Sequence, residues 1–164
     1  MRWSTCAAVV VLGHSGCGAL TGAVDVFLNP SDYLPLATQH SLRNILDRLL
    51  AVVQACAQKL VATFGSDIAG SPGYRQALIE AATVTNAALA AYSIQQELRV
   101  DESADLQAVY GVYLIESREV WTPQIGAATG AGLSVAPHDP AGFLELGDAI
   151  VRSERIASLI RSKA

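Results

Sequence analysis

The stretch from Val9 to Leu20 decides the fold, and it reads Val-Val-Val-Leu-Gly-His-Ser-Gly-Cys-Gly-Ala-Leu. The apolar run over residues 5–12 is short, rich in valine and bounded by Gly13, which is typical of a parallel strand buried on both faces. A glycine-rich turn follows over residues 13–18. The pattern of residues 19–28, which ends at Asn29 and Pro30, predicts a short helix. A strand, a tight turn and a helix in this order indicate an α/β fold.

The rest of the chain predicts longer helices and a late strand. Ser41 is a candidate N-cap, apolar residues recur at helical spacing from there to Phe64, and Gly65 ends this helix. We expect further helices over 74–98 and 141–160, strands over 109–115 and 120–121 around a polar turn, and a loop or extended arm over 122–140. The sequence therefore predicts one domain over residues 1–164, with a small, mostly parallel sheet flanked by helices.

Composition excludes several classes of protein. The chain has 164 residues, of which 51% are apolar and 16% charged, a balance opposite to that of a disordered chain. The net charge of −4 without a basic stripe argues against a nucleic-acid partner. Because polar residues interrupt every window of about 18 residues, no membrane span is expected. The mean hydropathy of +0.33 instead favours a covered sheet and a subunit interface, which predicts a homo-oligomer.

Cysteine usage indicates the compartment. The three cysteines, Cys6, Cys17 and Cys56, cannot all pair with one another. Residues 1–12 lack the pattern of a secretion signal, so we expect a reducing, cytoplasmic location.

His14 and Cys17 are the residues whose spacing indicates chemistry. They lie three positions apart where the strand ends and the helix begins, which is the end of a parallel strand at which α/β folds bind ligands. An imidazole and a thiolate suit zinc, and the neighbouring glycines let the backbone turn tightly enough for both to face one ion. The alternative is a tight turn in which Cys17 packs as a small apolar side chain.

The segment Gly-His-Ser-Gly-Cys-Gly-Ala at residues 13–19 resembles the second zinc motif of the β-class carbonic anhydrases. The later run of residues 106–115, an apolar stretch with Gly111 between aromatic residues, is similar to the late strand of that family. The resemblance covers about residues 5–121. It is specific at residues 13–19 and architectural elsewhere, and the loop and C-terminal helix of residues 122–164 lie outside it.

The resemblance implies a zinc enzyme that reversibly hydrates carbon dioxide to bicarbonate. His14 and Cys17 match the third and fourth metal ligands of the family. Its first Cys and its Asp come from a Cys-x-Asp-x-Arg motif on a neighbouring N-terminal strand, and this motif does not occur in the sequence. Cys6 lies eight residues before His14 on the same expected strand, about 26 Å away, so it cannot replace the missing Cys. Cys56 or His40 would reach the site only through an unusual fold.

Two alternatives stay open at the level of sequence. Residues 13–17 match the serine-hydrolase pattern Gly-x-Ser-x-Gly except at Cys17, which predicts Ser15 as nucleophile with His138 and a later acid, such as Asp105, as partners. The other alternative is a non-catalytic interaction module of the carbonic-anhydrase fold, in which another subunit covers the sheet edge left open by the missing strands. Either way, Arg152, Arg155 and Arg161 are expected on the solvated face of the last helix.

Overall fold

The computed structural model describes residues 8–100, 107–123, 125 and 132–161. The longer elements, in chain order, are β1 (Ala8–His14), α1 (Gly18–Leu28), α2 (Tyr33–Ala37), α3 (His40–Phe64), α4 (Tyr74–Val100), β2 (Gln107–Leu114), β3 (Glu119–Trp121), β4 (Ser134–Val135), α5 (Pro140–Arg152) and α6 (Glu154–Arg161). Short 3₁₀ turns at Pro30–Asp32 and Ser66–Gly70 lead into α2 and α4. The predicted α/β class is confirmed.

β2 is the centre of the sheet. It pairs in parallel with β1 from Ala8 opposite Gln107 to His14 opposite Tyr113. On its other edge β2 pairs antiparallel with both β3 and β4. The prediction of a mostly parallel sheet is therefore wrong, because the sheet is mixed. A tight turn, in which the Arg118 amide donates to the Leu114 carbonyl at 2.8 Å, returns the chain beside β2, as only an antiparallel hairpin allows.

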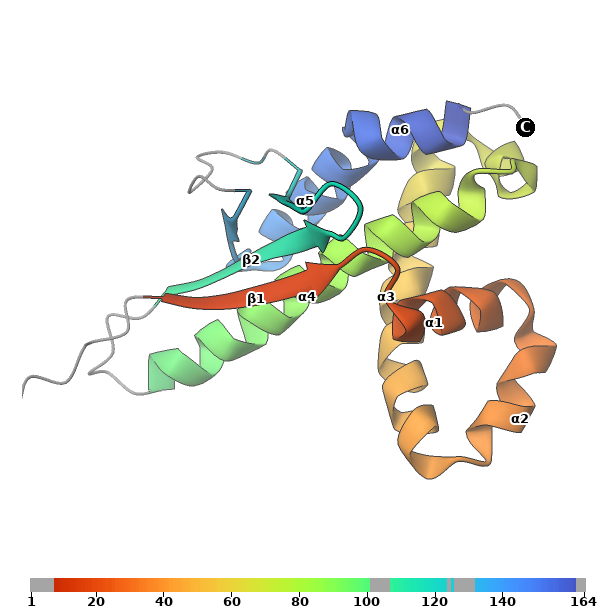
Figure 1. Ribbon diagram of the computed structural model, residues 1–164, viewed down its shortest axis with the longest axis horizontal. Helices are drawn as coiled ribbons and strands as arrows, with labels where there is room; N and C mark the ends of the chain where they lie inside the picture. Colours follow the sequence, from red (N-terminus) through yellow and green to blue (C-terminus); the bar gives the residue numbers. More distant parts are fainter. Residues whose placement is uncertain (1–7, 101–106, 124, 126–131, 162–164) are drawn as a thin grey trace, which may run out of the picture.

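α4 covers one face of the two parallel strands (Figure 1). Gly13 lies against this helix, where an added Cβ would be 3.4 Å from Ala87 Cβ. By length and composition, residues Tyr74–Glu97 of α4 would also suit a membrane span, with a mean hydropathy of 1.3. Over half of that apolar window is buried inside the fold, as expected of a helix that packs in a protein core.

The opposite face of β1 is open. Side chains of β1 alternate along the strand, and Val10 and Leu12 are each 50% exposed. The prediction of a strand buried on both faces is thus wrong. Within the described residues β1 pairs only with β2, so it is an edge strand with one covered face. The β-branched run determines strand structure, but long-range packing determines what lies beside it.

The helices pack around α4. α1 and α3, which precede α4 in the sequence, contact α4 and each other. α5 and α6, which follow it in the sequence, also contact α4. α3 begins at His40 after an N-cap at Gln39, so the predicted N-cap at Ser41 is two residues late, and the helix ends at Gly65 as predicted. The single predicted helix over 141–160 is two helices. Ser153 has an extended backbone between them, and its hydroxyl accepts a hydrogen bond from the Ile156 amide at 3.4 Å.

Candidate metal centre

The turn between β1 and α1 positions the predicted site at the carboxyl end of the parallel pair (Figure 1). Gly16 has a φ of +68°, a left-handed conformation that glycine adopts at little cost. Cys17 is extended and occupies the N-cap of α1. The chain therefore reverses over Ser15 and Gly16, and it brings His14 and Cys17 to the two ends of one short turn.

Ser15 fixes the turn to β2. Its amide donates to the Tyr113 carbonyl at 2.9 Å, and its hydroxyl accepts a hydrogen bond from the Ile115 amide at 2.9 Å. These two bonds extend the pairing of the strands beyond His14. As a result, the carboxyl ends of β1 and β2 stay paired side by side, and the turn after β1 has a defined position next to β2.

The ring of His14 contacts the next residue. His14 is exposed, and its Nδ1 lies 3.1 Å from the Ser15 carbonyl oxygen. Because a carbonyl oxygen only accepts hydrogen bonds, this contact suits a ring that donates through Nδ1 and presents Nε2 to solvent. Metal-binding histidines commonly have this arrangement, with one ring nitrogen donating to a carbonyl and the other facing the metal.

Cys17 is partly buried at the start of α1, and its side chain makes no capping hydrogen bond to the helix. The side chain instead packs against the hydrophobic core, as expected from the alternative in which Cys17 is a small apolar side chain. Because backbone amides at a helix N-terminus stabilise negative charge, this position suits an anionic ligand atom.

A zinc centre in a protein usually has four ligands, and the described residues offer two candidates at this turn. Across 8–100, 107–123, 125 and 132–161, no three His, Cys, Asp or Glu side chains are grouped closely enough to hold a metal ion. Cys56 is buried in α3, where its Sγ lies 3.4 Å from Thr85 Oγ1, and His40 begins the same helix. Cys6 lies outside the described residues. The turn therefore offers two ligand atoms, from His14 and Cys17.

An ion pair under the turn was not predicted. Arg155 of α6 pairs through Nε with Oε2 of Glu80, a carboxylate on α4 that is only 12% exposed. The Arg155 guanidinium also lies 5.9 Å from the centroid of the Trp121 ring. Together with Ser15, these groups line a cavity of about 10 Å³, enough for about one water molecule. The prediction of a solvated Arg155 is wrong because α6 folds back onto α4.

The residues of the serine-hydrolase alternative are not brought together. The Ser15 hydroxyl is bonded to the amide of Ile115, just beyond the carboxyl end of β2. The chain leading to His138 is bonded near the other end of β2, where the Ala136 amide donates to the Ala108 carbonyl. These two points are seven residues apart, or about 23 Å at the rise of a strand. Asp105 lies outside the described residues.

Comparison with protein-family models finds no matching family, and comparisons with curated proteins and with solved structures find no match.

Proposed function

We propose that His14 and Cys17 are two ligands of a zinc centre for the reversible hydration of carbon dioxide to bicarbonate, of the kind found in β-class carbonic anhydrases. The observation that carries the proposal is the contact of His14 Nδ1 with the Ser15 carbonyl oxygen at 3.1 Å. A ring that donates through Nδ1 in this contact presents Nε2 to a metal ion, as metal-binding histidines commonly do. Cys17 adds a thiolate ligand from the same turn, which Gly16 and the Ser15 hydrogen bonds hold in shape.

Zinc in such a centre activates water for attack on carbon dioxide. The contribution of this chain is to position two ligands at the end of a rigid parallel pair. The remaining ligands must come from outside the described residues, and the Cys-x-Asp-x-Arg motif that supplies them in the family does not occur in the sequence. We therefore expect the isolated chain to bind zinc weakly and to hydrate carbon dioxide slowly or not at all.

A stopped-flow assay of carbon dioxide hydration with one equivalent of zinc tests this function. The expected result is a rate close to that of buffer, with any excess lost in His14→Ala. A large excess that persists in both His14→Ala and Cys17→Ser would contradict the proposal. It would show that the reaction does not use these two ligands.

A second candidate is an interaction module that assembles through β1, and the open edge of this strand favours it. β1 has no charged residue and no proline, the features that normally protect an edge strand from pairing with another chain. We propose that a second copy of the chain pairs with this edge. A strand added there ends beside His14, so assembly and completion of the metal centre are compatible. The oligomeric state of β1 variants tests this candidate.

A further inference from the structure

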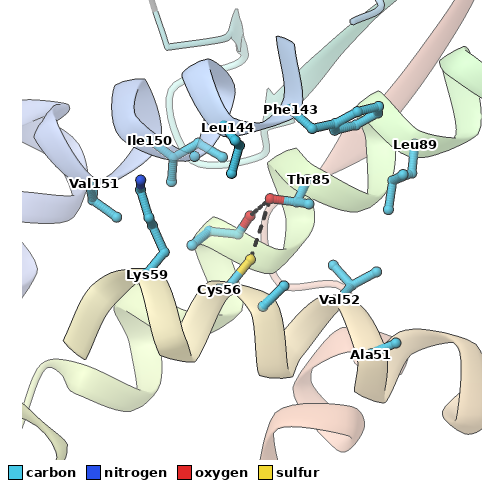
Figure 2. A pocket seen from close by; sticks show the side chains of 13 residues that line it. Ala51, Val52, Cys56, Lys59, Thr85, Leu89, Phe143, Leu144, Ile150 and Val151 are labelled. Atoms are coloured by element: carbon cyan, nitrogen blue, oxygen red, sulfur yellow. Dashed lines mark hydrogen bonds between the residues drawn. The ribbon is translucent and has the colours of Figure 1, made fainter. Parts of the chain in front are cut away.

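A groove separate from the His14–Cys17 turn runs between α3, α4 and α5 (Figure 2). We call it the α3–α5 groove; it has a volume of about 370 Å³, within the range of small-molecule sites. Its walls are almost entirely apolar. Val52 from α3, Leu89 from α4 and Phe143 from α5 lie toward one end, and Ile150 and Val151 lie toward the other.

The polar atoms inside the groove are already paired. The Thr85 hydroxyl donates to the Ala81 carbonyl at 3.0 Å. Its oxygen, 3.4 Å from Cys56 Sγ, is then available to accept from the thiol. Burial raises the pKa of Cys56 to about 11, so this thiol is neutral at physiological pH. A ligand in the middle of the groove therefore meets no unsatisfied donor or acceptor, and the interior suits a hydrocarbon chain.

A cationic side chain lies at one end of the groove. Lys59 lies at the end opposite Leu89 and Phe143, and its Nζ is 2.8 Å from Asp148 Oδ1 (Figure 2). An ammonium group has three donors, and the bond to Asp148 uses one of them. Arg152 also acts electrostatically on Asp148, but Glu145 and Glu154 lie in the same neighbourhood, so this end carries no excess of positive charge. What favours an anionic head group is Lys59 itself, whose ammonium keeps two donors beyond the bond to Asp148.

We propose that the α3–α5 groove binds a linear medium-chain carboxylate such as octanoate, with its carboxylate on Lys59 and its tail between Val52, Leu89 and Phe143. The length fits, because Ala51 and Lys59 line the groove eight residues apart on α3, or about 12 Å along the helix.

Calorimetric titration of octanoate and of octanol into the full chain tests the proposal. Octanoate is expected to bind one per chain. Lys59→Met keeps the aliphatic stem and removes the charge, so we expect it to weaken octanoate binding about tenfold, the loss of one charge-assisted hydrogen bond, and to leave octanol binding unchanged. Equal effects on both ligands, or binding of octanol without octanoate, would overturn the assignment of the carboxylate to Lys59.

Gly147→Leu blocks the groove. An added Cβ at Gly147 meets the Lys59 side chain at ordinary contact distances of 3.6 to 3.8 Å, so a leucine can enter the groove without a backbone clash. The matched control is Gly22→Leu, at a helical glycine with open space around it. We expect Gly147→Leu to abolish binding of both ligands and Gly22→Leu to retain it. If a thermal melt shows that Gly147→Leu is unfolded, Ala55→Leu at the exposed rim replaces it. Unchanged octanoate affinity in a folded blocking variant would overturn the proposal.

Discussion

Replacing Leu12 with lysine places a charge on the open edge of β1. Leu12 is 50% exposed on the face opposite α4, so a lysine there reaches solvent in a single chain. Because the other half of the leucine is already covered in the single chain, the folded monomer should lose up to about 1.5 kcal/mol of stability, less what the lysine stem restores. In an assembly paired through β1, residue 12 stands on one face of the joined sheet beside side chains of the partner strand, so a lysine there replaces an apolar cross-strand contact and loses part of its hydration.

The magnitude follows from the exposure of the edge. Full burial of a leucine or valine side chain contributes about 1.5–3 kcal/mol, and half of that is still available at Val10 and at Leu12. In a two-fold pair each residue occurs twice. Leu12→Lys thus removes at most about 1.5–3 kcal/mol of burial, the value for side chains that the partner covers completely, and weakens association by up to about a hundredfold.

Sedimentation velocity over a dilution series measures this effect. We expect the wild-type chain to associate and Leu12→Lys to shift the transition to higher concentration. The matched control is Leu34→Lys on α2, where the leucine is 71% exposed and lies far from the sheet, and it should associate like the wild type. A wild-type chain that stays monomeric, or equal association of the wild type and Leu12→Lys, would refute assembly through β1.

Three further predictions concern the packing of the helices. An added Cβ at Gly73 would lie 1.8 Å from a carbonyl oxygen of α6, so Gly73→Ala should lower the free energy of urea unfolding by about 1–3 kcal/mol, whereas Gly22→Ala, in open space, should not lower it. Arg155→Met leaves a carboxylate of α4 without its cation, and we expect a loss of about 1–2 kcal/mol in calorimetry; Arg161→Met, in a pair open to solvent, should have little effect. Burial raises the pKa of Cys56 from 9.0 to about 11, so the unfolded state loses the thiol proton first. The stability of the wild type relative to Cys56→Ala should be constant below pH 9 and decline by about 2–3 kcal/mol as the pH rises to 11; a flat difference would contradict the burial of this thiol.

Local sequence predicts most of the helices and the central strand. The predicted bounds of α1 and α4 lie within two residues of the observed ends, because α1 stops at Asn29 and Pro30 and α4 coincides with an alanine-rich stretch that begins after Gly73. The exposure of β1 was not predictable, since a run of valines has the same pattern in an edge strand as in a central one. The sequence also does not predict the break at Ser153 between α5 and α6, because neither glycine nor proline occurs at or beside this position.

The candidate site divides in the same way. His14 and Cys17 belong to one short turn, so their proximity follows from residues adjacent in the sequence. The pairing of Glu80 with Arg155 depends on how α6 packs on α4, and neither residue has a local signal for it. The α3–α5 groove likewise combines three helices from distant parts of the chain, and only the fold brings them together.

Titration with cobalt(II) to a large excess, needed because two ligands bind a metal ion weakly, followed by displacement with excess zinc tests the central claim most directly, since a thiolate ligand gives bound cobalt a near-ultraviolet absorption band. Cys17→Ser is a sound variant, since serine is a preferred N-cap residue and should preserve α1. We predict that the wild type and Cys56→Ser develop the band and lose it when zinc is added, and that His14→Ala and Cys17→Ser do not develop it. No band in the wild type, or a band that persists in Cys17→Ser, would contradict a zinc centre at this turn.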